Sequence, residues 1–202
     1  MGQNDAYDVV GSNVKFTGNV IEVRVDDVRM SDGKVARREI VAHPGAVAVV
    51  ALDDAGKIVL VNQYRHPVRA RLDELPAGLL DVAGEPALTA AQRELAEETG
   101  LAADEWHVLV DVFSSPGMTD EAVRIFLARG LSPAGGAFEP EHEEITMHVF
   151  RESLSDSVRR VLNGSIVNAS AVAGILAAVH SRATGWRDLR PADAPWPARP
   201  GH

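Results

Sequence analysis

The stretch that decides the fold is GLLDVAGEPALTAAQRELAEETGL, which runs from Gly78 to Leu101. Its second half predicts a helix over about residues 86–99. Pro86 suits the first turn of a helix, and Gly100 suits the left-handed residue that ends one. The stretch therefore predicts a loop, a helix and a sharp stop.

The predicted helix gathers carboxylates on one face. Glu94 and Glu98 are four residues apart, and Glu97 is three residues from Glu94, so the three side chains share a face. Like charges at this spacing repel one another by a few tenths of a kcal/mol per pair. A divalent cation reverses the sign of that interaction, because hard cations such as Mg²⁺ take oxygen ligands. The pattern therefore favours a metal site over an ordinary solvated helix face, which is the alternative.

Composition narrows the classes of function. The chain has 202 residues, a formal net charge of −9 and no cysteine. The negative charge disfavours nucleic acid as a partner, and the lack of cysteine excludes a disulfide framework or a thiol nucleophile. No secretory signal and no membrane-spanning apolar run is visible. We expect a cytoplasmic protein with a small-molecule substrate and no membrane partner.

The N-terminal part predicts a small antiparallel unit. Residues 1–14 are mostly polar and are expected to be loose. Residues 20–30 largely alternate apolar and polar side chains, residues 31–33 (SDG) predict a hairpin turn, and residues 35–41 predict the return strand. A hairpin alone is marginally stable in water, so it must pack on the rest of the chain or on a second subunit.

The remaining chain predicts a mixed sheet with helices on its faces, the α/β (α+β) class. Further strands are expected at residues 46–52, 57–64, 106–113, 122–128 and 145–150, and further helices at residues 153–162 and 169–181. The segment from Trp186 onward is rich in proline and is expected to be an extended tail, docked through Trp186 or Trp196. This gives an N-terminal β unit (1–44), a central domain (45–184) and a tail (185–202).

The opening stretch resembles the signature of the Nudix hydrolases. Glu85 is followed by seven residues and then by RELAEETGL, residues 93–101, which matches the family pattern. Six residues separate Gly78 from Glu85, one more than is usual, and the extra residue falls in the loop before the helix. The resemblance covers about residues 45–180 and implies an α/β/α sandwich, with the acidic loop–helix–loop beside the sheet.

The resemblance also assigns a metal site. It implies that Glu94 and Glu98 are direct ligands, that Glu97 is a ligand or a neighbour of the ligands, and that the carbonyl of Ala77 contributes. The implied cofactor is Mg²⁺ (or Mn²⁺), with two or three ions. Arg93 is implied to orient the glutamates. The helix has no His or Cys, so a zinc site is disfavoured.

A second acidic run, EPEHEE at residues 139–144, precedes the last predicted strand. In the ADP-ribose pyrophosphatases of the family, a loop glutamate in this region is the general base. The resemblance therefore implies Glu141, Glu143 or Glu144, and the sequence does not rank them. The alternative is a solvated acidic loop.

The substrate contacts implied by the same subfamily come from separate segments. Arg65 ends a Gln-x-Arg strand, and Arg38 belongs to an Arg-Glu pair on the N-terminal unit. Arginine suits this role because its planar donors pair with two phosphate oxygens. Glu74 could accept hydrogen bonds from an adenine amino group or a ribose hydroxyl. Each of these charges could instead form a surface ion pair or lie at a strand edge.

Residues 114–121 (SSPGMTDE) connect two predicted strands and match a Ser-Pro-Gly pattern of the subfamily. Gly117 and Asp120 within it are implied to line the part of the pocket that selects the second half of the substrate. Gly and Pro alone would predict a tight loop whatever the function.

The reaction expected from the resemblance is metal-dependent hydrolysis of ADP-ribose to AMP and ribose 5-phosphate by a homodimer, in which Arg38 serves the partner's pocket. One alternative is another nucleoside diphosphate sugar, such as GDP-mannose, or a diadenosine polyphosphate. The other is a nucleotide-sensing module without catalysis, although the glutamates at positions 94, 97 and 98 are all present.

Overall fold

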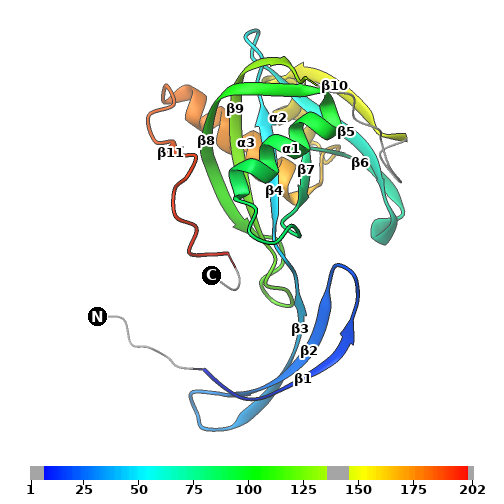
Figure 1. The fold of residues 1–202 in the computed structure, drawn as a ribbon, viewed down its shortest axis with the longest axis vertical. Coiled ribbons are helices and arrows are strands. Elements are labelled where there is room, and N and C mark those ends of the chain that lie inside the picture. The colour runs from blue at the N-terminus through cyan, green and yellow to red at the C-terminus, as the bar shows by residue number, and fades with distance from the viewer. Residues whose placement is uncertain (1–6, 136–145, 200–202) are drawn as a thin grey trace.

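A computed structural model describes residues 7–135 and 146–199 (Figure 1). Its strands are β1 (Asp8–Thr17), β2 (Glu22–Arg29), β3 (Val35–Ala42), β4 (Ala46–Ala51), β5 (Lys57–Arg65), β6 (Ala70–Glu74), β7 (Ala77–Leu79), β8 (Leu101–Phe113), β9 (Ala122–Pro133), β10 (His148–Ser153) and β11 (Arg190–Pro191). Its helices are α1 (Ala87–Thr99), α2 (Leu154–Leu162) and α3 (Ala169–Ala183), with a short 3-10 turn, η1, at His66–Val68.

The strands form three sheets. The N-terminal sheet has the order β1-β2-β3, a second sheet has the order β10-β5-β6, and the largest has the order β11-β8-β9-β4-β7. The largest sheet is mixed, because β4 and β9 are parallel whereas its other pairs are antiparallel. The predicted mixed sheet with helices is therefore confirmed.

Strand β4 shows why the sheet carries a layer on each face. Val47, Val49 and Ala51 belong to one buried cluster, which includes Leu95 of α1. Ala48, Val50 and Leu52 belong to another, which includes residues of α2 and α3. Successive side chains of a strand point to opposite faces, so the continuous apolar run of this segment fills both layers. Figure 1 shows α1 across one face and α3 behind the sheet.

The N-terminal sheet has three strands, whereas the sequence predicted a hairpin preceded by a loose segment. The prediction for residues 8–14 is wrong: β1 begins at Asp8 and pairs antiparallel with β2. Its valines and Phe16 favour a strand, and β2 supplies the backbone hydrogen bonds that hold it. The polar residues among them masked this preference in the sequence. The turn at residues 31–33 is confirmed, with Gly33 at φ 82°.

The other strands differ from the predictions mainly at their ends. β8 begins at Leu101 rather than at residue 106, because the chain leaves the cap at Gly100 directly into the sheet. β9 continues to Pro133, and the short strands β6 and β7 were not predicted. The last predicted strand is β10, which begins at His148; residue 145 lies outside the described residues.

The proline-rich tail is docked, as the sequence predicted. β11 pairs with β8 at the edge of the largest sheet. Trp186 packs beside the α3 layer and Trp196 beside the α1 layer. The guanidinium of Arg129 lies over the Trp186 ring, and that of Arg124 over the Trp196 ring. Among the described helices, none has both the length and the apolarity needed to cross a membrane.

Candidate active site

Helix α1 presents the predicted carboxylates to strand β7. Its buried face consists of Ala90, Ala91, Glu94 and Leu95, so one glutamate faces the sheet together with the apolar residues. Glu94 is only 9% exposed. A buried carboxylate is costly unless it is paired or hydrogen-bonded, so this position indicates a specific role.

Gly78 in β7 makes room for that carboxylate. A Cβ built on Gly78 would lie 2.0 Å from both Cδ and Oε1 of Glu94. The φ angle of Gly78 is not in the left-handed region, so the requirement for glycine is space alone. The absence of a side chain at position 78 lets the carboxylate of Glu94 lie against the strand.

Arg93 joins the acids of the loop and the helix. Its Nε and Nη2 donate to Glu85 at 3.2 and 3.1 Å, and its Nη1 donates to Glu94 at 2.7 Å and to Glu97 at 3.0 Å. The hydrogen bond with Glu85 raises the pKa of Arg93, and the charge of Glu94 adds to this, although burial opposes it. Arg93 is thus a permanent positive charge that orients three carboxylates.

Glu98 reaches the same strand from the last turn of α1. Its Oε2 accepts a hydrogen bond of 2.9 Å from the backbone N–H of Ala77. The carboxylates of Glu94 and Glu98 therefore meet neighbouring residues of β7. The structure brings these two residues to Ala77 and Gly78, while Glu97 is held by Arg93, whose Nη1 also bonds Glu94.

The donor set suits a hard divalent cation, because it consists of carboxylate and carbonyl oxygens without His or Cys. Within residues 7–135 and 146–199, however, no three His, Asp or Glu side chains are grouped closely enough to hold a metal ion. Glu94 and Glu97 share the charge of Arg93 instead.

Arg65 and Glu74, both predicted substrate contacts, lie together. Nε and Nη2 of Arg65 donate to the carboxylate of Glu74 at 2.7–3.2 Å. Glu74 is 2% exposed and also accepts a hydrogen bond of 3.4 Å from Gln63. Its carboxylate thus holds the guanidinium of Arg65 at the end of β5.

Arg38 is not brought to this site within one chain. It lies on β3 in the N-terminal sheet, which Figure 1 shows projecting away from α1. Its Nη1 donates to the carbonyl of Arg37 and its Nη2 lies 3.8 Å from Sδ of Met30.

The loop of residues 114–121 runs beside the base of the N-terminal sheet. Gly117 has open space where a side chain would begin. The carboxylate of Asp120 accepts a hydrogen bond of 2.9 Å from the N–H of His43. This contact joins residues 77 positions apart, and no pattern in the sequence predicted it. Glu141, Glu143 and Glu144 lie outside the described residues.

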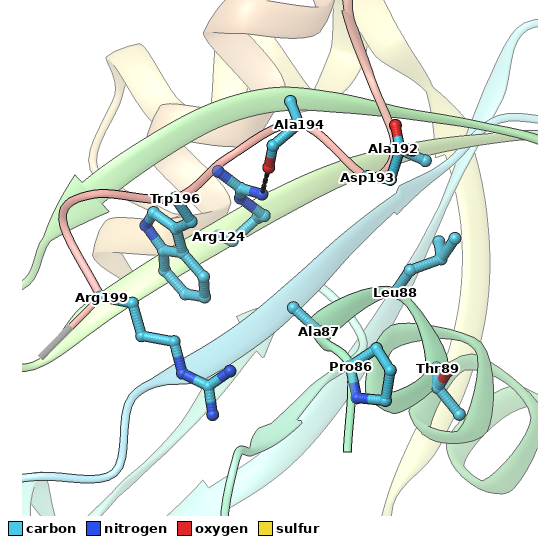
Figure 2. Close-up of a pocket in the computed structure, with 10 residues that line it drawn as sticks. All are labelled: Pro86, Ala87, Leu88, Thr89, Arg124, Ala192, Asp193, Ala194, Trp196 and Arg199. Atoms are coloured by element: carbon cyan, nitrogen blue, oxygen red, sulfur yellow. Dashed lines mark hydrogen bonds between the residues drawn. The ribbon is translucent and has the colours of Figure 1, made fainter. Parts of the chain in front are cut away.

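A concavity of about 410 Å³ lies between the first turn of α1 and the C-terminal tail (Figure 2). Its walls include Pro86, Ala87, Trp196 and Arg199, and none of the predicted site residues lines it. Arg124 on its floor is fully engaged: it pairs with Asp111 and donates to the carbonyls of Ala194 and Pro195. The dashed line in Figure 2 marks the bond to Ala194.

Comparisons with known proteins agree with this arrangement. A profile of the NUDIX domain matches residues 42–164. An ADP-ribose pyrophosphatase of Mycobacterium tuberculosis is 49% identical over 200 residues, which cover 99% of this chain and 95% of that protein. An ADP-ribose pyrophosphatase of Bacillus subtilis is 41% identical over 79% of this chain and 85% of its own length. A protein of Bacillus methanolicus named methanol dehydrogenase activator is 36% identical, with the same coverage.

Among solved structures, one described as an ADP compounds hydrolase superposes with a TM-score of 0.75 and 22% identity, covering 89% of this chain and 96% of that one. This likeness concerns the fold alone. Together with the acidic helix against β7, the sequence matches confirm the predicted resemblance: the chain belongs to the Nudix family.

Proposed function

We propose that this protein is an ADP-ribose pyrophosphatase, which adds water across the diphosphate bond of ADP-ribose and releases AMP and ribose 5-phosphate. One observation carries the proposal: α1 sets two carboxylates against β7, that of Glu94 at Gly78, which has no side chain, and that of Glu98 at the N–H of Ala77. The 49% identical relative, which spans nearly the whole chain and bears that name, supports the choice of substrate.

The proposed cofactor is Mg²⁺ or Mn²⁺, in two or three ions. Glu94, Glu98 and the carbonyl of Ala77 would hold it, with Glu97 as a further ligand or a close neighbour. When bound, such cations neutralise phosphate oxygens and lower the pKa of a bound water. Arg93 orients the glutamates through the hydrogen bonds described above and does not contact the substrate.

The diphosphate would be held by arginines. Arg65 is presented by the buried carboxylate of Glu74, which limits the conformational entropy that the guanidinium loses on binding. Glu74 retains lone pairs for a hydroxyl or amino group of the substrate. Gly117 and Asp120 belong to the loop that we assign to the second half of the substrate.

A general base must take a proton from the attacking water. We assign this step to Glu141, Glu143 or Glu144 of the acidic loop. The proton passes to that carboxylate, the water oxygen bonds to one phosphorus, and the bond from that phosphorus to the bridging oxygen breaks. The other phosphate leaves with the bridging oxygen, so no covalent enzyme intermediate forms.

We further propose a cytoplasmic homodimer in which the N-terminal sheet contacts a second copy. Strand β1 leaves Val9, Val10, Val14 and Phe16 between 46% and 58% exposed, which is unusual for a sheet that packs only on itself. Arg38 lies on the same sheet and would enter the partner's pocket. Dilution tests this arrangement: the KM should rise as the dimer dissociates, and an unchanged KM in a demonstrable monomer would exclude a shared pocket.

The substitution Glu98→Gln tests the proposed reaction. The amide can still hydrogen-bond to β7 through its oxygen but is a poor ligand for a cation, so kcat should fall about 100-fold or more. Binding of ADP-ribose, measured by calorimetry, should persist through the arginines. Glu105→Gln is the matched control, because Glu105 is a surface residue of β8 paired with Arg129, and its activity should be unchanged. Persistent hydrolysis by the Glu98 variant would refute the metal assignment.

The alternative substrates remain worth measuring, because a relative named GDP-mannose pyrophosphatase is 30% identical over 72% of this chain. A panel of ADP-ribose, GDP-mannose, other ADP-sugars and diadenosine polyphosphates separates them. We expect the highest kcat/KM for ADP-ribose, and equal values across the panel would remove that preference.

A further inference from the structure

The N-terminal sheet meets the rest of the protein at a narrow joint. Only residues 43–45 separate the end of β3 at Ala42 from the start of β4 at Ala46. Figure 1 shows the sheet standing apart from the domain, with the loop between β8 and β9 beside the base of β3. The contacts at this joint therefore decide the direction in which the sheet projects.

Backbone hydrogen bonds tie β3 to that loop. The N–H of Val41 donates to the carbonyl of Met118 at 2.8 Å, and the N–H of Asp120 donates to the carbonyl of Val41 at 3.4 Å. Val41 and Thr119 form a parallel bridge. The loop that we assign to substrate selection is thus hydrogen-bonded alongside the end of β3.

The carboxylate of Asp120 adds a contact to each side of the joint. Its Oδ1 accepts from the N–H of His43 at 2.9 Å, and its Oδ2 lies 4.0 Å from Nη2 of Arg24 on β2. The side chain of Asp120 is about one third exposed. One carboxylate therefore joins the loop, the linker and the N-terminal sheet.

The linker itself is bent in a fixed way. Nδ1 of His43 accepts a hydrogen bond of 3.1 Å from the N–H of Gly45, and its Nε2 lies 3.7 Å from Oε1 of Glu121. Gly45 has φ 87°, a conformation that disfavours other residues, and a Cβ there would lie 3.2 Å from the carbonyl oxygen of Ala122. The bend of residues 43–45 is held by these hydrogen bonds, so the loss of one of them should change the angle of the bend.

We propose that Asp120 is a positioning residue, which fixes the N-terminal sheet relative to the substrate loop through the N–H of His43 rather than by touching the substrate. This inference rests on the proposed function and names a determinant of it. Arg38 lies five residues before His43 along a strand, or about 17 Å away at the usual rise per residue. A rotation of about 5° at the joint would therefore move Arg38 by about 1.5 Å, enough to weaken a phosphate contact.

The test compares Asp120→Ala with the conservative Asp120→Asn. The alanine variant loses the acceptor, so exchange of the His43 amide with deuterium, followed by NMR, should become at least about tenfold faster. Its KM for ADP-ribose should rise about tenfold, with kcat changed less than about twofold, because the reacting groups on α1 are untouched. The asparagine variant keeps an acceptor oxygen, so both quantities should stay within about threefold of the wild-type values.

Two results would overturn the proposal. One is an unchanged exchange rate at His43 in the alanine variant. The other is a KM that rises equally in both variants while the His43 amide of the asparagine variant stays protected, because the negative charge would then act on the substrate directly. The exchange measurement does not depend on enzyme activity. A wild-type protein that fails to hydrolyse ADP-ribose would therefore count against the proposed function, while exchange of the His43 amide would still test the positioning role of Asp120.

Discussion

Replacing Gly78 with alanine should displace the carboxylate of Glu94 while changing the stability of the fold little. The new Cβ would lie 2.0 Å from Cδ and Oε1 of Glu94, whereas ordinary contact begins at 3.4 Å. The carboxyl group must therefore move by about 1.4 Å, or β7 must leave its neighbour β4. The carboxyl group is the end of a flexible side chain, so rotation of Glu94 costs less than separation of two strands.

The expected effects follow from that displacement. A misplacement of about 1 Å in a catalytic group can cost about 100-fold in rate, so kcat should fall by about that factor. Stability should change little: Glu94 loses part of its hydrogen bond with Arg93, about 1–2 kcal/mol, and alanine recovers about 0.5–1 kcal/mol by restricting the unfolded chain. The melting temperature should therefore fall by less than about 5 °C.

The assay measures AMP release at saturating ADP-ribose and Mg²⁺, together with thermal unfolding of the same preparations. Gly135→Ala is the control, because a Cβ at this exposed residue meets nothing within 4 Å and the backbone does not need glycine there. Activity within about threefold of wild type in the Gly78 variant would refute the idea that this glycine places a catalytic carboxylate. A melting temperature lowered by more than about 10 °C would show instead that β7 itself had moved.

Two further predictions concern the tail and its anchor. Burial opposes ionisation of Asp111, but hydrogen bonds from Arg124 and Arg190 outweigh it and lower the pKa of Asp111 below its usual 3.8. Because the pKa of Asp111 is lower in the folded than in the unfolded protein, its ionised carboxylate stabilises the fold at any pH above the pKa of the unfolded state. This stabilisation is lost as the pH falls through the pKa of the folded state. Asp111→Asn should therefore cost about 3 kcal/mol at pH 7 and progressively less below about pH 4. Urea unfolding across that pH range checks this, and a difference independent of pH would contradict it. Trp196→Ala should lose about 2 kcal/mol, seen as a lower melting temperature and faster proteolysis of the C-terminus, whereas Trp196→Phe should keep most of the packing; equal proteolysis of all three proteins would show that the tail is not docked in solution.

The acidic helix was predictable because everything that defines it is local. The spacing of Glu94, Glu97 and Glu98, the stop at Gly100 and the apolar face all lie within about four turns, and a helix repeats every 3.6 residues. The same holds for β4, whose unbroken apolar run is typical of a strand buried on both faces. The sequence therefore predicts which side chains lie on the same face of an element, but not which other elements they contact.

Partners from distant segments could not be predicted in the same way. Arg65 and Glu74 each suggested a substrate contact, yet in the structure they bond to each other. The register of β5 and β6 pairs Glu74 with Val61 and Arg65 with Ala70, so the contact joins positions that are not opposite one another. The contact of Asp120 with His43 depends on how two loops meet. Such contacts are set by sheet order, which the strands' own sequences do not encode. From the sequence alone, a charged residue near a predicted site can equally form an ion pair within the protein or bind a substrate.

One long-range contact did leave a trace in the sequence, and its chemistry explains why the tail docks. Arg124 interrupts an apolar strand and is 3% exposed, so its guanidinium must find acceptors inside the protein. Asp111 on the adjacent strand neutralises the charge but leaves donors over, and these bind the carbonyls of Ala194 and Pro195. Proline has no N–H and therefore interrupts sheet pairing, which leaves carbonyl oxygens without strand partners. A proline-rich segment that leaves the sheet after β11 is thus well suited to satisfy a buried arginine within it.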